Sequence, residues 1–325
     1  MNKVDRRTSY TAADIIPLKV LLDKDLLQST QNGKIIPLHI QFMPTNKCNL
    51  KCVFCSCSER NKSLEMPFDD AKRIIDDCKL LGTKAVTISG GGEPLCYPNF
   101  EELIEYFNYR GIKIGMVTNG LLLHKINSKT LSKITWCRIS SGDDRDFNDN
   151  YNQQLHKVVT ENNNVDWAFS HVITSRPNID TIKKIIKFAN EHNFTHVRLV
   201  ADLFTPEFID MRVIKSFLSG LDDSLVIYQG RKEYTKGTDC YICYLKPVIA
   251  PDLKVYACCG AQYALETPTK DMPEELSLGD ARDIWQIIDK SIKPFNGAKC
   301  VKCYYSGYNS LLNSLLSKIE HQEFV

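Results

Sequence analysis

The run PTNKCNLKCVFC, residues 44–55, decides how this chain is organised. It follows an apolar stretch, residues 35–42, which predicts a β-strand that tolerates its proline near the start. Three thiolates on one short loop can hold three corners of an iron–sulfur cubane and leave the fourth iron open. The alternative is a zinc site with Cys57 as the fourth ligand, although zinc sites usually pair C-x2-C elements. The candidate ligands of the cubane are Cys48, Cys52 and Cys55.

Apolar strand-like runs then alternate with amphipathic helices up to about residue 230. Such alternation predicts βαβ units and a parallel sheet. About six or seven units fit, so we expect an α/β fold of the partial (β/α)6 TIM-like barrel type, with its chemistry at the carboxyl ends of the strands. Strands are predicted at residues 85–89, 113–118, 136–140, 167–174, 196–200 and 225–228, and helices at 68–81, 100–109, 155–161, 179–191 and 208–218.

A second motif closes the next predicted strand, where the sequence reads ISGGGEP over residues 88–94. Glycines there let the backbone approach a ligand closely. Together the two motifs resemble the radical S-adenosylmethionine (SAM) superfamily, whose signature is C-x3-C-x-aromatic-C followed by a GGE or GGEP loop. The resemblance implies that Phe54 lies beside the SAM adenine. It also implies that the methionine amino group of SAM is held by Gly90, Gly91, Gly92 and Glu93.

Weaker matches follow in the order that the resemblance requires. Thr118 and Asn119 belong to a TNG sequence at a strand end, as is frequent in this family. Ser140 stands where the family commonly reads ISIDG and implies a polar contact near the SAM ribose, but the sequence departs there at Ser141 and Gly142. Arg198 ends a later strand and is expected either to face the cofactor pocket or to form a surface salt bridge.

The chemistry implied by the resemblance is reductive cleavage of SAM. A reduced [4Fe–4S] cluster passes an electron to the SAM sulfonium, giving methionine and a 5′-deoxyadenosyl radical that abstracts a hydrogen atom from a substrate. This implies an electron donor such as flavodoxin or ferredoxin. Cys96, just after the glycine loop, is the candidate hydrogen-donating thiol, whereas Cys78 and Cys137 are expected to be buried apolar side chains.

A second group of cysteines lies beyond residue 230, where PDLKVYACC, residues 251–259, predicts a hairpin that turns at Pro251 and Asp252. On spacing alone a zinc ribbon and an iron–sulfur site are equally compatible. The stretch resembles the SPASM and twitch extensions of radical SAM enzymes, with Leu253 where glycine is usual. The resemblance implies one auxiliary [4Fe–4S] cluster. Its ligands are expected to be Cys240, Cys258, Cys300 and Cys303, with Cys243 and Cys259 as alternates.

A reading that uses Cys243 is similar to the GTP cyclase of molybdenum-cofactor synthesis and would leave an open iron for substrate. The predicted organisation is therefore an N-terminal helical segment at residues 1–34, a radical SAM core at 35–229 and an auxiliary-cluster domain at 230–325. Residues 1–34 are too few for the leader-recognition domain fused to some peptide maturases, so we expect such a function elsewhere.

Composition limits the possible partners. The formal net charge of +2 gives no sign of a nucleic-acid-binding surface, and no apolar run has the length of a signal peptide or a membrane span. A cytoplasmic location is therefore expected. In a reducing cytosol the clustering of the thirteen cysteines favours metal binding over disulfides. The expected substrate is a peptide or a small molecule. Alternatives are a nucleotide-modifying enzyme, a scaffold that binds SAM without cleaving it, and a non-catalytic zinc-binding adaptor.

Overall fold

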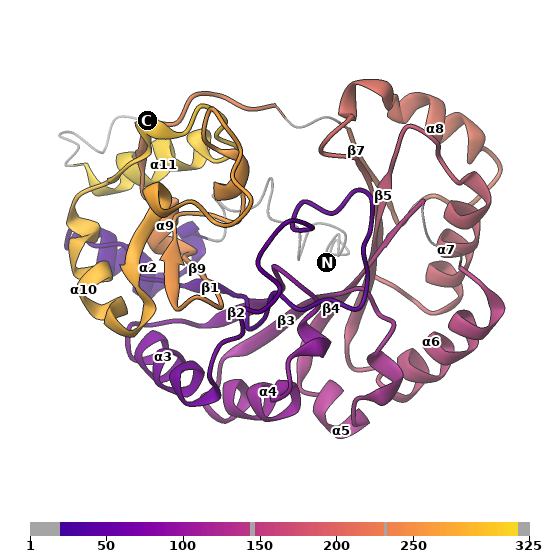
Figure 1. Ribbon diagram of the computed structural model, residues 1–325, viewed down its shortest axis with the longest axis horizontal. Coiled ribbons are helices and arrows are strands. Elements are labelled where there is room, and N and C mark those ends of the chain that lie inside the picture. The colour runs from indigo at the N-terminus through magenta and orange to yellow at the C-terminus, as the bar shows by residue number, and fades with distance from the viewer. Residues whose placement is uncertain (1–19, 144–146, 231–232, 318–325) are drawn as a thin grey trace.

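The computed structural model describes residues 20–143, 147–230 and 233–317. Its main sheet has ten strands in the order β11-β10-β9-β1-β2-β3-β4-β5-β6-β7. Strands β1 to β7 are parallel to their neighbours. The sheet curves into an open arc with the helices α3 to α8 on its outer side (Figure 1). This confirms the predicted partial TIM-like barrel.

The parallel strands match the predicted positions closely. They are β1 (His39–Phe42), β2 (Ala85–Ile88), β3 (Lys113–Thr118), β4 (Ile134–Gly142), β5 (Asp166–Ile173), β6 (His196–Ala201) and β7 (Val226–Gln229). The longer helices are α2 (Lys24–Gln31), α3 (Phe68–Leu80), α4 (Phe100–Tyr109), α6 (Asp149–Glu161), α7 (Ile179–Glu191), α8 (Met211–Phe217) and α11 (Ser306–Leu316), and the short ones are α5 (Ser128–Leu131), α9 (Ile242–Leu245) and α10 (Ile284–Asp289).

Side-chain alternation separates the two faces of the sheet. On β4, Cys137 and Ile139 are buried towards the helices, whereas Arg138 and Ser140 lie on the opposite, inner face. The helices supply the matching apolar stripe: α7, for example, buries one side, starts at the side-chain cap of Asn178 on the Thr181 N–H, and exposes its lysines. The inner face of the arc is thus left for polar groups.

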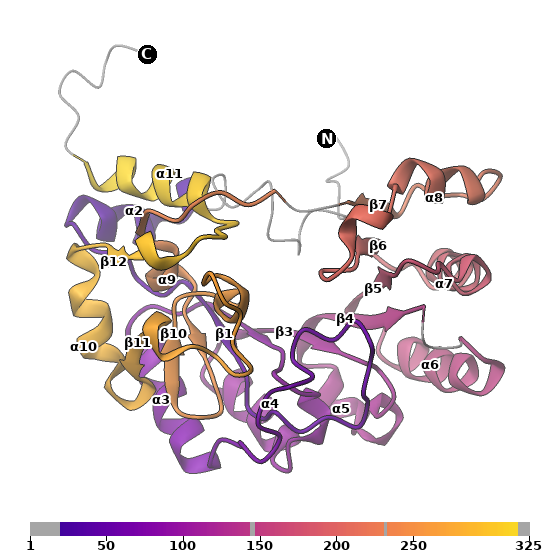
Figure 2. The ribbon, with the colours of Figure 1, turned by 45° about the horizontal axis from the view of Figure 1, so that its top comes forward.

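The C-terminal part of the chain continues the same sheet at the opposite end from β7 (Figure 2). Strand β9 (Val248–Ile249) runs parallel to β1, and β10 (Lys254–Tyr256) and β11 (Ser277–Asp280) follow it in antiparallel fashion. A separate two-stranded ribbon pairs β8 (Asp239–Cys240) with β12 (Phe295–Asn296). Because β9 pairs with β1 and β10 pairs with β9, Cys258 and Cys259, which follow β10, are connected to the barrel through one continuous sheet.

The predicted hairpin turn is present. The N–H of Leu253 donates to the carbonyl of Ala250 at 3.0 Å, so Pro251 and Asp252 occupy the turn between β9 and β10. Leu253 has a φ of +62°, the left-handed conformation that favours the glycine usual at this place. The chain therefore keeps the turn of the resembling sequences, with a leucine in the left-handed position.

Several predicted boundaries were wrong. The first strand begins at His39 because Pro37 and its neighbours do not join the ladder. Helix α6 begins at Asp149, because the Asn148 side chain caps the Tyr151 N–H upstream of the apolar residues. The helix predicted at 208–218 starts only at Met211. Residues 1–19 of the predicted N-terminal segment lie outside the described residues. Within the described part, no helix has both the length and the apolar character that crossing a bilayer requires.

Candidate SAM and iron–sulfur site

The three cysteines of the first motif lie on the loop between β1 and α3, over the inner side of the arc (Figures 1 and 2). The Cys55 N–H donates to the Cys52 carbonyl at 3.1 Å, which closes a tight turn. Backbone N–H groups also point at sulfur: Leu50 donates to the Cys48 Sγ and Cys57 to the Cys55 Sγ, each at 3.4 Å. Such N–H···S bonds stabilise thiolates and tune the clusters they hold.

Glu93 joins the three motif loops at the carboxyl ends of β1, β2 and β3. Its buried carboxylate accepts hydrogen bonds from the Thr118 hydroxyl at 2.6 Å and from the Asn119 N–H at 2.7 Å. The Glu93 N–H in turn donates to the Lys47 carbonyl at 2.7 Å. The Asn119 amide completes the connection by donating to the Asn49 Oδ1 at 2.7 Å. The glycine loop and the TNG sequence are thus locked to the cysteine loop.

The glycines of the second motif are required because the glycine loop lies very close to the cysteine loop. A Cβ on Gly92 would lie 2.0 Å from the Lys47 carbonyl oxygen, and one on Gly91 would lie 1.9 Å from the Asn46 Oδ1. The Asn46 Oδ1 is itself buried without a hydrogen-bond partner among the described residues. Only glycine lets the two loops pack this closely.

Phe54 rests on the end of β4. A Cβ on Gly142 would lie 1.9 Å from the Phe54 Cε1, so the ring packs directly on the glycine backbone. This is the position at which the sequence departs from the family pattern. The departure therefore has a steric reason in this chain, since a larger residue at 142 would displace the aromatic ring next to the cysteines.

A C-terminal segment, residues 261–272, forms hydrogen bonds with the cysteine loop. The sequence analysis did not predict these contacts. Arg60 is buried and donates through Nε to the Gln262 Oε1 at 2.8 Å. The Tyr263 hydroxyl donates to the Ser56 carbonyl at 2.6 Å, and the Asn61 N–H donates to Asp271 at 2.8 Å. No sequence spacing signals contacts across some two hundred positions, so only the fold reveals them.

The second cysteine group gathers around the β8–β12 ribbon. The Gly237 N–H donates to the Cys300 carbonyl at 2.7 Å, and Thr235 exchanges two backbone hydrogen bonds with Cys303. Burial, together with the nearby Cys240 and Cys303, raises the pKa of the Cys300 thiol to about 11. Burial likewise raises the pKa of Cys258, with Cys240 and Cys300 among its neighbours. Cys240 thus influences the other three predicted ligands, and the alternates Cys243 and Cys259 lie near the same thiols.

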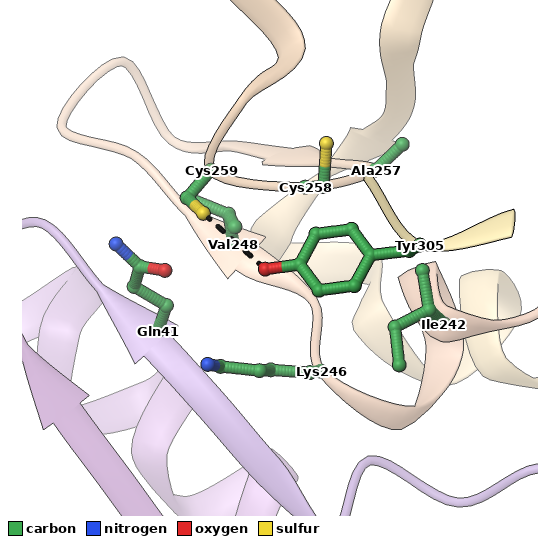
Figure 3. A pocket seen from close by; sticks show the side chains of 8 residues that line it. All are labelled: Gln41, Ile242, Lys246, Val248, Ala257, Cys258, Cys259 and Tyr305. Carbon is green, nitrogen blue, oxygen red and sulfur yellow. Dashed lines mark hydrogen bonds between the residues drawn. The ribbon is translucent and has the colours of Figure 1, made fainter. Parts of the chain in front are cut away.

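The two alternate ligands behave differently. Cys243 is fully buried in α9 and donates its thiol to the Cys240 carbonyl at 3.2 Å. Cys259 turns away from Cys258 into a small hollow, where its Sγ lies 3.7 Å from the Tyr305 hydroxyl (Figure 3). Lys246 and Gln41 project into the same hollow (Figure 3).

The remaining predicted residues divide into two sets. Ser140 and Arg198 lie on the inner face of the arc, and no ion pair of Arg198 occurs among the described residues, which argues against the surface salt bridge. Cys96 lies close to Cys48 and Glu93, and burial raises the pKa of its thiol. Cys78 and Cys137 are fully buried, as expected for apolar side chains.

The donor set suits iron–sulfur clusters. All thirteen cysteines are free thiols, and seven of them occupy the two loop groups described above as expected ligands. In the described part of the chain no three His, Cys, Asp or Glu side chains are positioned so that together they could hold a metal ion. The N–H···S bonds of the first loop and the packed cradle of Phe54 on Gly142 nevertheless fit a cluster with a nucleoside beside it.

The family model of the radical SAM superfamily matches residues 42–213, more than half of the chain. The chain belongs to the radical SAM superfamily. Members of this family use a [4Fe–4S] cluster and SAM. The functions of the individual cysteines and of the loops around them stay predictions. The match begins at the last residue of β1 and ends within α8, and so it covers strands β2 to β6 of the barrel.

Among curated proteins, the chain is 31% identical over 158 residues to a probable GTP 3′,8-cyclase of Methanococcus maripaludis, covering 48% of this chain and 46% of that protein. It is 28% identical over 142 residues to the Fe-coproporphyrin III synthase of Methanosarcina barkeri, covering 39% and 35%. The chain thus spans less than half the length of these radical SAM relatives.

Among solved structures, SuiB of Streptococcus suis bound to the precursor peptide SuiA aligns with a TM-score of 0.60 at 17% identity. The alignment covers 88% of this chain and 75% of SuiB. At this identity the likeness concerns the fold. It extends beyond the barrel, since the aligned share exceeds that of the family match.

Proposed function

We propose that this radical SAM chain reductively cleaves SAM and directs the resulting radical at a substrate bound on the inner side of the barrel. The observation that carries the proposal is the buried Glu93 carboxylate, which joins the cysteine, glycine and TNG loops through the bonds to Thr118 and Asn119. Three motifs that are separate in sequence form one connected surface at the strand ends, where barrel enzymes bind their substrates.

Each residue has a defined task in the proposed site. Cys48, Cys52 and Cys55 hold the cluster, and Phe54 covers the adenine from its seat on Gly142. Gly90, Gly91, Gly92 and Glu93 hold the methionine end, while Thr118, Asn119 and Ser140 line the ribose side. When bound, the reduced cluster and SAM supply a 5′-deoxyadenosyl radical that removes a hydrogen atom from an unactivated C–H bond. The chain contributes position and exclusion of water.

We further propose that residues 230–325 hold one auxiliary [4Fe–4S] cluster through Cys240, Cys258, Cys300 and Cys303. The electrostatic influence of Cys240 on Cys258, Cys300 and Cys303 supports that set. Cys243 uses its thiol on a backbone carbonyl, and Cys259 faces the hollow beside Tyr305. An electron donor of the flavodoxin or ferredoxin type would supply the first cluster.

Two classes of substrate are candidates for the proposed site. A peptide is the first candidate, supported by the fold shared with a peptide-bound structure. A nucleotide or another small molecule is the second candidate, supported by the sequence similarity to proteins named as GTP 3′,8-cyclases. Either substrate would place a C–H bond near the SAM ribose. The two candidates differ in the size and chemistry of the group that the inner side of the barrel must bind.

The test is anaerobic purification followed by incubation with SAM and dithionite. The proposal predicts a brown protein with about eight iron atoms per chain and formation of 5′-deoxyadenosine. A colourless protein that carries zinc would support the adaptor hypothesis instead. An iron-loaded protein that binds SAM but yields no 5′-deoxyadenosine would be a degenerate scaffold and would contradict the proposed cleavage.

A further inference from the structure

The inner face of the barrel carries three cations that come from three different segments. Arg138 lies on β4 and Arg198 on β6, both on the strand face opposite the helices. Lys246 lies between α9 and β9, on the far side of the arc, and its side chain points into the hollow beside Gln41 (Figure 3). All three side chains are half-buried.

None of the three forms an ion pair within the part of the chain that the structure describes. The Nε of Arg138 is shielded from solvent and has no hydrogen-bond partner there. Arg138 otherwise lies over the Trp136 ring, 5.6 Å from its centroid. Among the described residues, Arg198 donates to the Ser170 hydroxyl at 3.1 and 3.3 Å.

The carboxylates closest along the chain are engaged elsewhere. Asp202, at the end of β6, accepts from the Phe204 N–H at 3.2 Å and from the Thr205 hydroxyl at 3.1 Å. Asp143, after β4, pairs with His171 at 2.9 Å and accepts from the Asn178 N–H. Glu93 is occupied by the motif loops. None of these three acids forms an ion pair with Arg138, Arg198 or Lys246 in the described part of the chain.

Mutual electrostatic effects support the proximity of the cations. Burial and then Arg198 lower the pKa of Arg138, and burial lowers the pKa of Arg198 to about 10. Burial also lowers the pKa of Lys246; the nearby Cys259 thiol opposes this shift, and Arg138 adds to it. Partly buried like charges are unfavourable without a compensating anion. An anion that enters between them would gain charge-assisted hydrogen bonds from both sides of the arc.

We propose that Arg138, Arg198 and Lys246 form an anion site that anchors a phosphate or carboxylate group of the substrate. This inference rests on the proposed function and specifies its substrate class. Two guanidinium groups suit the planar, bidentate recognition of such oxygens, and the lysine adds a point charge. A substrate held there by its anionic end would extend from the barrel interior towards the cysteine loop, where the radical forms.

The experiment measures anion binding to the anaerobically reconstituted holoprotein by calorimetry, with inorganic pyrophosphate as the phosphate probe and succinate as the carboxylate probe. We expect one of them to bind, and the tighter one identifies the anionic group. Arg138→Gln and Lys246→Gln should each weaken that binding at least about tenfold, since each removes a charge-assisted contact. Arg138→Lys should restore part of it, and Lys183→Gln, on the exposed face of α7, serves as the control.

Three outcomes would overturn the anion site. Neither probe binds, or the variants bind the probe as tightly as the Lys183→Gln control, or Arg138→Gln weakens SAM binding and leaves probe binding intact. In the last case the arginine holds the carboxylate of SAM. Circular dichroism and iron content establish that each variant is folded and loaded. Formation of 5′-deoxyadenosine by the unmodified protein is measured separately, so failure of the proposed cleavage is distinguishable from failure of the anion site.

Discussion

The Glu93 carboxylate accepts a hydrogen bond from the backbone N–H of Asn119 at 2.7 Å, which ties the loop after β2 to the loop after β3. The same carboxylate accepts from the Thr118 hydroxyl and from the Leu95 N–H. A buried carboxylate with three donors around it fixes the backbone geometry of both loops. It explains why a glutamate follows the glycines in this chain: it connects the motif loops.

Glu93→Gln should therefore disrupt the site. The amide group of glutamine brings donors to a place where the protein already supplies donors, so one N–H or hydroxyl loses its acceptor. We expect the free energy of unfolding to fall by about 1–3 kcal/mol and SAM binding to weaken. Denaturant titration and equilibrium binding measure the two effects. Glu102→Gln, on the exposed side of α4, is the matched control; equal behaviour of both variants would contradict the connecting role.

Gly142→Ala should displace the Phe54 ring, because the new methyl group would lie 1.9 Å from its Cε1. Overpacking of this kind costs about 1–3 kcal/mol. In a Phe54→Ala background the same substitution should cost less than about 0.5 kcal/mol, since the clash is gone. Gly307→Ala, with nothing within 4 Å of the added carbon, should instead be neutral or stabilising. Additive costs in the double variant would refute the contact.

Gln262→Leu should loosen the cysteine loop from the C-terminal segment. It leaves the buried Arg60 Nε without its acceptor, and hydrogen bonds to charged groups contribute about 1.5–3 kcal/mol. Hydrogen exchange should become faster in residues 56–62, which the segment braces. Gln286→Leu, on the exposed side of α10, should leave the exchange unchanged. Unaltered protection in Gln262→Leu would mean that the brace does not stabilise the loop.

A comparison of Cys258→Ala with Cys259→Ala should show which of the two adjacent cysteines binds the auxiliary cluster. The first should reduce the iron content from about eight to about four atoms per chain, because one cluster is lost. The second should retain the iron, since the Cys259 Sγ faces the Tyr305 hydroxyl. Iron and sulfide analysis with Mössbauer spectroscopy measures both. If only the Cys259→Ala variant lost iron, Cys259 would be the cluster ligand and the assignment of Cys258 would be wrong.

The sequence predicts the barrel well because period-two and helical patterns are local. β3, α4 and α7 have the predicted bounds. The start of α6 was missed because its first turns are polar and only the Asn148 cap marks them. The places of the cysteine loop and the glycine loop were predictable as well, since each follows the end of a strand. The Arg60–Gln262 contact and the seat of Phe54 on Gly142 depend on long-range packing, which no spacing reveals.

The most direct measurement is 5′-deoxyadenosine formation by a protein in which Cys48, Cys52 and Cys55 are all replaced by alanine. After anaerobic reconstitution with iron and sulfide, the unmodified protein should cleave SAM on reduction by dithionite. The triple variant should retain its fold and about four iron atoms in the C-terminal site, and should form no 5′-deoxyadenosine. Cleavage of SAM by the triple variant at the rate of the unmodified protein would contradict the role of the first cysteine group.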